Sequence, residues 1–284
     1  MLNTSGMFYG CYNLSSLNLS GCNFDNLQNT YMMFRWCYML NTKNIDWSLF
    51  NMTNVKDISY MFDDCYHITN LNLESWDTSN ITKMYGVFSD CSNLETLNIS
   101  NWDVSNVQTI VAMFSGSKSL SSVNLSNWNT TNVSDACYLF MNCYGLHTAN
   151  LSDWNLCNLT RASQYHYGIF SACTGLREVD VSNWNLCSLS NCNYMFSDCT
   201  QLVNIDVSNW NINNATSLSY MFQACNNLSN KSIDSIINMC LNAPNITIKN
   251  LSNTSYDSPF SGTNISNIRF QNRWAELDVA GWTY

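Results

Sequence analysis

Cysteine is the residue type in this sequence with the most potential chemistry. The chain has 14 Cys among 284 residues, and eight of them stand three positions after a Phe. These are Cys11, Cys37, Cys65, Cys91, Cys143, Cys173, Cys199 and Cys225. Ser117 occupies the same position after Phe114. A disulfide ladder or a chain of metal ligands is conceivable, but zinc sites use clustered Cys-x2-Cys pairs, which the sequence lacks. Since free Cys packs as a small apolar residue, we expect buried thiols, no metal and no cofactor.

Two further cysteines, Cys157 and Cys187, each stand three positions after a Trp. If neighbouring repeats stack about 5 Å apart, the two Cα atoms lie within the range that a disulfide requires. Two free thiols are the favoured interpretation, and a disulfide is the alternative.

Histidine offers no catalytic arrangement. The three His residues, His67, His147 and His166, fall at three different positions of the repeat, whereas a triad or a metal site needs side chains that converge. No catalytic residue is predicted, and the chain is not expected to be an enzyme.

Tryptophan also recurs at one position of the repeat. The members are Trp47, Trp76, Trp102, Trp128, Trp154, Trp184 and Trp210. Exposed rings in such a column could bind sugars, but the regular spacing and the position at the end of a predicted strand favour structural stacking.

The elements that carry these residues repeat about nine times. Phe8, Phe34, Phe62, Phe88, Phe114, Phe140, Phe170, Phe196 and Phe222 are separated by 26, 28, 26, 26, 26, 30, 26 and 26 residues. Periods of this length are typical of solenoids. Leu97 and Ile99 alternate with polar residues, as in a strand, and the stretch from Val107 to Leu120 has the spacing of a helical or 3-10 apolar stripe.

One strand and one helical segment per unit predict an α/β repeat solenoid of the leucine-rich-repeat type. We expect residues 1–228 to form about nine turns, with a parallel β-sheet on one face and short helical or 3-10 segments on the other. After residue 228 the apolar spacing predicts a helix over 229–241. A strand, a loop and an aromatic tail, containing Phe270 and Trp282, then complete a C-terminal capping segment over 229–284. No comparable cap is expected at the N-terminus.

Polar residues on the outward side of the predicted strands are the candidate binding site. In leucine-rich repeats this side is the concave face, where partners usually dock. The regular members are Asn72, Asn98, Asn124, Asn150, Asp180 and Asp206, and the less repetitive ones are Glu95, His147, Arg177 and Glu178. Alternatively, the Asn side chains bond to one another along the stack and only stabilise it. A four-residue insertion adds the candidates Arg161, Tyr165, His166 and Tyr167.

Composition excludes several partners. Charged residues make up 11% of the chain, the formal net charge is −9, and no Lys/Arg cluster occurs. Nucleic acid and anionic membrane surfaces both require a basic patch, so neither is expected to bind. No apolar run approaches the roughly 20 residues that span a bilayer, and no signal peptide is visible in this chain.

The repeat resembles the 26-residue repeat of BspA-like bacterial surface proteins. The residues that carry the resemblance are Met61-Phe62-Asp63-Asp64-Cys65 with Leu71-Asn72-Leu73-Glu74-Ser75-Trp76-Asp77-Thr78-Ser79-Asn80-Ile81, and Asn101-Trp102-Asp103-Val104-Ser105-Asn106-Val107. The resemblance implies a secreted or surface-anchored adhesin that binds other molecules and has no catalytic activity.

These patterns predict a non-enzymatic, adhesion-type protein at the cell surface, outside the cell or on a virion. Its polar concave sheet would bind a protein or a glycan on a host or neighbouring cell. The alternative is a structural subunit of a fibre, filament or phage appendage, assembled by head-to-tail stacking of solenoid ends.

Overall fold

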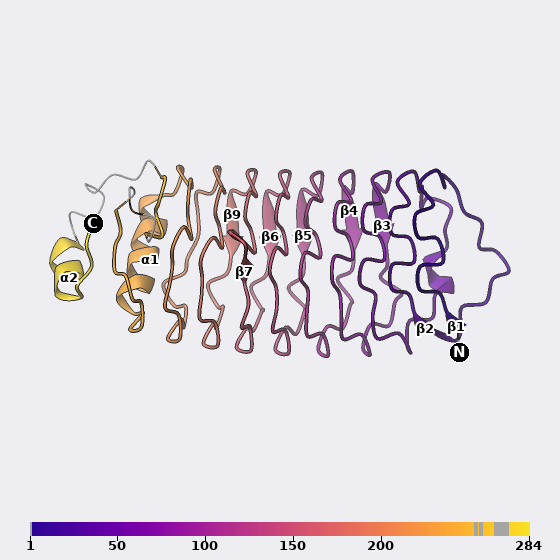
Figure 1. The fold of residues 1–284 in the computed structure, drawn as a ribbon, viewed down its shortest axis with the longest axis horizontal. Coiled ribbons are helices and arrows are strands. Elements are labelled where there is room, and N and C mark those ends of the chain that lie inside the picture. The colour runs from indigo at the N-terminus through magenta and orange to yellow at the C-terminus, as the bar shows by residue number, and fades with distance from the viewer. Residues whose placement is uncertain (1, 253–254, 256–257, 264–272) are drawn as a thin grey trace.

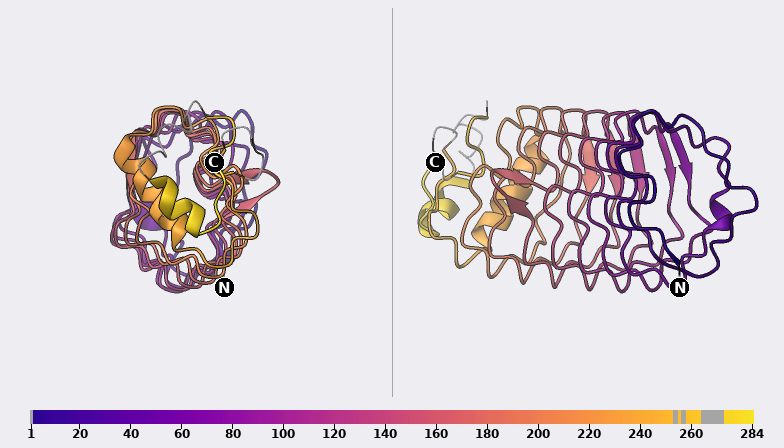
Figure 2. Two further views of the ribbon diagram at one scale, coloured as in Figure 1. Left: turned by 90° about the vertical axis from the view of Figure 1, so that its left-hand side faces the viewer. Right: turned by 45° about the vertical axis from the view of Figure 1, so that its right-hand side comes forward.

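A computed structural model describes residues 2–252, 255, 258–263 and 273–284, and Phe270 of the predicted tail lies outside them. The chain winds into coils that stack along one axis, with the two termini at opposite ends of the rod (Figure 1). Viewed along that axis the coils share one outline (Figure 2). The expected repeat solenoid is therefore observed.

Each strand of the solenoid is short and parallel to its neighbours. β1 (Leu2–Asn3) pairs with β2 (Leu27–Asn29), and β3 (Asn70–Asn72) pairs with β4 (Thr96–Asn98). β5 (Ser122–Asn124), β6 (Thr148–Asn150) and β9 (Glu178–Asp180) form a three-stranded sheet in that order. Among the described residues the strand face is thus a row of small parallel sheets, rather than the single sheet that we predicted.

The segments predicted to be helical are turns. Within the repeats as described, the one helical element is the 3-10 helix η1 (Trp47–Leu49). Most coils place residues with positive φ two positions before and two after the Phe, such as Tyr60 (58°) and Asp64 (60°) on either side of Phe62. A right-handed helix cannot contain such residues, because their backbone is left-handed. The apolar residues are buried as predicted, but the segment that carries them consists of consecutive turns and not of a helix.

These turns still join each coil to the next. Phe62 N–H donates to Val87 O in the following coil (3.0 Å), whereas Cys65 N–H donates to Phe62 O in its own coil (3.1 Å). Bridges elsewhere continue the pairing through Asp57, Lys83, Thr109, Asp135 and Arg161. Coils are therefore held at strand spacing, about 4.8 Å, on several sides.

This uniform spacing explains the shape of the rod. A leucine-rich repeat curves where helices, about 8–10 Å apart, lie opposite strands about 4.8 Å apart. Here turns replace those helices, and the rod is nearly straight in Figure 1. The strand face carries local grooves, and the concave curvature that we expected of it stays a prediction.

Aromatic columns fill the core. Phe62 and Phe88 stack at 5.8 Å with 4° between planes, and Trp76 and Trp102 at 6.0 Å with 7°. The Trp102 ring is 2% exposed, and its Nε1–H donates to Leu73 O of the preceding coil (3.0 Å). The Trp column is therefore structural, as expected, and presents no platform for sugars.

The repeated cysteines bond to the backbone. The Cys91 thiol donates to Phe62 O at 3.1 Å, and the same contact recurs from Cys37, Cys65, Cys143, Cys173, Cys199 and Cys225. In the repeat of Phe114, where Ser117 replaces the Cys, the Ser117 hydroxyl donates to Phe88 O at 2.8 Å, which explains why serine fits there. All 14 cysteines, including Cys157 and Cys187, are free thiols, and Cys187 Sγ lies 3.6 Å from Cys157 O.

The helix α1 (Asn230–Leu241) continues the solenoid in a different conformation. Ile205 N–H donates to Ser232 Oγ (3.0 Å) and Val207 N–H to Ser235 Oγ (2.6 Å). Two serine hydroxyls of α1 thus accept the hydrogen bonds that the next strand would otherwise accept. The helix lies where it was predicted.

Further turns follow α1. Thr247 N–H donates to Thr216 O (3.1 Å) and Phe222 N–H to Pro259 O (2.8 Å), as in earlier coils. The repeat's hydrogen-bond pattern therefore extends past the predicted boundary at residue 228. Beyond it come α2 (Trp274–Val279) and a parallel bridge between Asn250 and Thr283.

The insertion forms a hairpin. β7 (Ser163–Gln164) pairs antiparallel with β8 (Tyr167–Gly168). No helix among the described residues is both long and apolar enough to cross a membrane.

Candidate functional site

A groove on the strand face gathers half of the ten predicted strand-face residues. Its volume is about 630 Å³, and it runs across β5, β6 and β9 to the coil at 204–206 and the start of α1. The predicted residues that line it are Asn124, Asn150, Glu178, Asp180 and Asp206. We call it the strand-face groove; in Figure 1 its strands lie in sequence toward α1.

The Asn and Asp side chains of the groove close local turns. Asn124 Oδ1 accepts from Ser126 N–H (3.2 Å) and Oγ (2.9 Å), and Asp180 Oδ1 accepts likewise from Ser182 (3.2 and 2.8 Å). Asn150 with Ser152 and Asp206 with Ser208 repeat the pattern. These Oδ1 atoms accept hydrogen bonds within their own coil. They therefore do not form the Asn-to-Asn bonds along the stack that were the alternative interpretation.

Charge in the groove is mainly negative. Glu178, Asp180 and Asp206 line it, and Lys231 of α1 is the one cation among the described lining residues. Hydrogen bonds from the Ser208 hydroxyl and N–H lower the pKa of Asp206, and Lys231 lowers it further. The Asp206 carboxylate is therefore ionised at neutral pH, and the groove suits a partner that presents hydrogen-bond donors.

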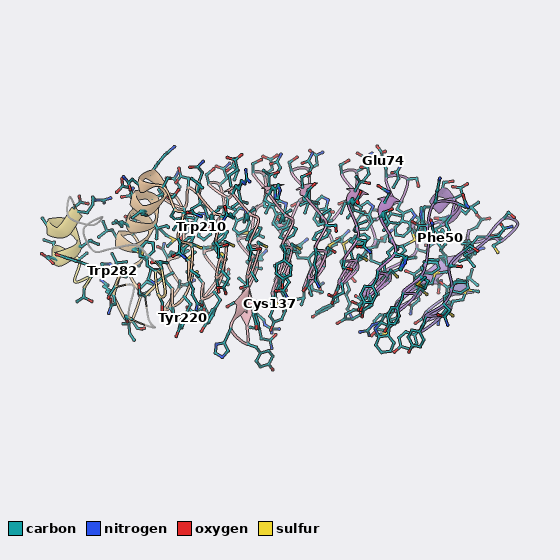
Figure 3. The ribbon with its side chains drawn as sticks, turned by 90° about the horizontal axis from the view of Figure 1, so that it is seen from above. Phe50, Glu74, Cys137, Trp210, Tyr220 and Trp282 are labelled. Carbon is teal, nitrogen blue, oxygen red and sulfur yellow. The ribbon has the colours of Figure 1, made fainter. Side chains whose placement is uncertain are left out.

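The other predicted strand-face residues lie around this groove or apart from it. Asn72 and Asn98 line a second recess of about 530 Å³, on β3 and β4. Asn98 Nδ2 also donates to Glu74 Oε2 (2.9 Å), a residue labelled in Figure 3. His147 and Arg177 are exposed and adjacent, since Arg177 N–H donates to His147 O (3.2 Å), whereas Glu95 lies two coils further toward the N-terminus.

The insertion places its predicted residues on another side of the rod. In Figure 3 the hairpin projects from the edge opposite α1 and Glu74. Tyr165, 77% exposed, and His166 form its turn, and Tyr167 is also exposed. Arg161 is not a free charge, because it contacts Asp135 Oδ2 (2.8 Å) and donates to Gln164 Oε1 (2.8 Å).

The three histidines lie at separate places on the solenoid. His67 Nδ1 lies 2.9 Å from Tyr38 O, His166 is at the hairpin tip, and His147 is on the strand face. The described part of the chain contains no group of three or more His, Cys, Asp or Glu that could hold a metal ion.

An aromatic surface near the N-terminus was missed by the sequence analysis. Tyr12 and Tyr38 lie 5.0 Å apart, Tyr38 and Tyr66 also 5.0 Å, and Tyr9 lies 4.9 Å from Trp36. The signal was available, because Tyr follows the repeated Cys in three successive repeats. The sequence analysis did not compare the residue after each repeated Cys, so it did not predict this surface.

Taken together, fold and surface define a repeat solenoid with a stacked aromatic core and recesses on its sides. The family comparison is consistent with such a repetitive chain, since one family model matches residues 1–73, 56–174 and 166–247. The chain belongs to that family, described as "Mycoplasma protein of unknown function, DUF285".

Solved structures with detectable similarity include three proteins. A leucine-rich cell surface protein from Faecalibacterium prausnitzii shares 13% identity over 94% of this chain and 77% of that one, with a TM-score of 0.35. A leucine-rich-repeat protein from Bacteroides ovatus shares 16% identity over 79% and 68%, with a TM-score of 0.29. The functional domain of InlJ from Listeria monocytogenes, described as including a cysteine ladder, shares 15% identity over 87% and 72%, with a TM-score of 0.18.

A search of curated protein sequences gave no match.

Proposed function

We propose that this protein is a non-enzymatic interaction protein, located at the cell surface, outside the cell or on a virion. It binds a protein or a glycan of a host or neighbouring cell through its strand face. The observation that carries this proposal is the strand-face groove, where five predicted residues from four successive coils line one recess. A rigid scaffold favours binding because little conformational entropy is lost when the partner docks.

The chemistry of the groove indicates what the partner presents. Its walls combine exposed Asn and Ser side chains with the carboxylates of Glu178, Asp180 and Asp206. Carboxylates accept hydrogen bonds and repel anions, so the partner surface carries amide, hydroxyl or cationic groups. Nucleic acid is excluded from the proposal, because its phosphates would be repelled by these carboxylates and by a net charge of −9. Membrane insertion is no part of it.

The experiment compares capture by the intact chain and by two matched variants. Asp180→Lys reverses a charge in the groove. Asp103→Lys is the control, because Asp103 also accepts from the N–H of the residue two positions later (2.9 Å) but lies away from the groove. Each chain is immobilised and exposed to an extract of host-cell surface proteins and glycans.

We expect the intact chain and Asp103→Lys to capture the same partner, and Asp180→Lys to capture at least about fivefold less. Equal capture by both variants would show that the partner binds elsewhere, and this outcome would overturn the proposed site.

The alternative of a fibre or appendage subunit stays a prediction. One observation argues against stacking through the C-terminal end: the N–H groups of Tyr220 and Phe222 donate to Ser258 O and Pro259 O of the same chain, and in this last described turn Phe260 N–H donates to Ser258 Oγ (3.0 Å) and not outward. We propose that α1 and the residues after it act as the cap of the solenoid, because they cover those groups and the edge at 203–207.

A further inference from the structure

The hairpin of β7 and β8 adds a recess that the other coils lack. Tyr165 and His166 form its turn with φ values of 49° and 72°, so the two strands are joined by two left-handed residues. In Figure 2 (left) the hairpin stands outside the outline that the coils share. The insertion into this one repeat therefore forms one wall of the recess, and that wall is the hairpin of β7 and β8.

Close contacts hold the hairpin against the next coil. A Cβ on Gly168 would lie 2.5 Å from Met195 Cα, so only glycine allows this approach. Gly168 N–H donates to Ser171 Oγ (2.6 Å), which donates to Tyr194 O (2.8 Å). At the tip, His166 Nδ1 lies 3.0 Å from Tyr194 Oη. The recess is thus preformed, which lowers the entropic cost of binding a ligand.

The recess has a volume of about 510 Å³, within the range of roughly 300–1,000 Å³ that is typical of small-molecule sites. We call it the hairpin cleft. Ser163, Gln164 and Tyr165 line it from the hairpin, and Asn191, Tyr194 and Tyr220 from the next two coils. The Tyr194 and Tyr220 rings stack at 4.7 Å with 9° between planes, so their facing sides cover each other. Tyr165, 77% exposed, is the lining tyrosine whose ring is most open to a ligand.

The cleft carries no fixed charge. None of the described lining residues is Asp, Glu, Lys or Arg, and the nearby Arg161 is engaged by Asp135 and Gln164. Its polar groups are amides, hydroxyls and one imidazole, which both donate and accept hydrogen bonds. A charged ligand would lose hydration here without gaining an ionic partner.

We propose that the hairpin cleft is a binding site for a neutral saccharide. A sugar ring has an apolar C–H face that packs on a tyrosine ring and a rim of hydroxyls that pair with amides, and the cleft offers both surfaces together. Among its described lining residues the cleft offers no long open sheet edge, which is one of the common surfaces for binding an extended peptide. This site is separate from the strand-face groove, since the hairpin projects from the edge opposite α1 in Figure 3.

The test uses the full chain on an array of neutral oligosaccharides built from hexoses, fucose and N-acetylhexosamines, with sialylated and sulfated glycans beside them. The strongest neutral glycan is then titrated by calorimetry into Tyr165→Ala, Tyr165→Phe and the control Tyr144→Ala, a half-exposed tyrosine outside the cleft. Because Tyr165 is 77% exposed, its substitution leaves the core intact.

We expect neutral glycans to bind and Tyr165→Ala to weaken binding at least about tenfold, while Tyr165→Phe and Tyr144→Ala stay within about twofold. Affinity should change little between roughly 0.05 and 0.5 M salt, because no ion pair forms. Asp180→Lys should leave this binding unchanged, which separates this site from the proposed function. Binding only to charged glycans, only to peptides, to no neutral glycan, or equally to Tyr165→Ala would overturn the proposal.

Discussion

Several repeated residue types of this solenoid form contacts between successive coils. The thiols of the cysteine column donate to Phe carbonyl groups, the Trp indoles donate to the carbonyl of a preceding coil, and Asn106 Nδ2 donates to Ser79 O (2.8 Å). A buried carbonyl that accepts a second hydrogen bond is better satisfied than one left with a free lone pair. The repeated Cys and Trp residues, which were candidates for chemistry in the sequence, therefore mostly serve to hold successive coils together.

Ser117 tests this interpretation of the cysteine column. Ser117→Ala removes a hydrogen bond to Phe88 O, which keeps the bond from Cys91 N–H (3.3 Å), so we expect a loss of about 1 kcal/mol of stability. Ser117→Cys restores the group found in the other repeats and should stay within about 0.5 kcal/mol of the natural chain. Urea unfolding, followed by circular dichroism, measures both. Equal stability of the two variants would contradict the role of the hydrogen bond.

Thiol reactivity gives a second test at this scale. Burial raises the pKa of Cys37 and of Cys192 to about 12, so these thiols should not react with a thiol reagent near pH 8 in the folded chain. The exposed Cys11 and Cys22 should react first. In denaturant without reductant all 14 should react, and fewer than about ten would indicate disulfides.

The same pKa values predict how stability depends on pH. The folded-state pKa lies above the unfolded value of 9.0, so the neutral thiols contribute their full stabilisation below about pH 9. Between pH 9 and 12 the unfolded thiols ionise first, and stability should fall as pH rises. An unfolding midpoint that stays constant from about pH 8 to about 10.5 would contradict this expectation.

At the scale of elements, hydrogen bonding decides which conformation each segment adopts. The Met-Phe segment has the apolar spacing of a helix, yet alternate N–H groups bond to the next coil, which a helix cannot allow. α1 shows the reverse case, since a helix occupies the place of a strand and its Ser232 and Ser235 accept from the strand edge. Tertiary contacts therefore override the local pattern in the turns, and serine hydroxyls make the helix compatible with the sheet.

Ser235 is the residue of α1 to change. Ser235→Ala leaves the buried Val207 N–H without its acceptor, and we expect a loss of about 1–3 kcal/mol. Asp234→Ala, at an exposed position of the same helix, is the control and should change stability by less than about 0.5 kcal/mol. Amide exchange at Val207 should accelerate in Ser235→Ala alone. Unchanged exchange there would show that α1 does not protect this edge.

At the scale of the whole molecule, the two ends of the rod differ. In the last described turn at the C-terminal end, Phe260 N–H donates to Ser258 Oγ (3.0 Å), whereas Met7, Tyr9 and Tyr12 are exposed in the first coil. Stacking between identical copies needs two complementary ends, and an occupied end offers no template. The sides of the rod, with the strand-face groove and the hairpin cleft, are therefore the proposed interaction surfaces.

Light scattering tests this view of the ends. We expect the intact chain to remain a monomer of about 32 kDa at micromolar concentration, because its C-terminal donors are engaged internally. Growth of long particles with rising concentration would instead support the filament alternative.

Much of the architecture could be read from spacing alone. A period of mostly 26 residues, alternating strand positions and recurring Phe, Trp and Cys together indicate a stacked solenoid with most of those side chains inside. The helix at 230–241 also followed from its apolar spacing, although Ser229, which we placed inside the helix, is its N-cap. These features are local or periodic, so they do not depend on knowing which coil lies beside which.

Only the tertiary structure decided what lies between the coils. Left-handed residues such as Tyr60, Asp64 and Ala112 turn the expected helices into turns, and their φ values are set by hydrogen bonds to residues about 25 positions away. Those bonds straighten the rod and create the strand-face groove from four coils. Other contacts between coils, such as the bonds of Ser171 and His166 to Tyr194, hold the hairpin of β7 and β8 in place. The sequence could not predict these features, because a contact between neighbouring coils has no signature within a single repeat.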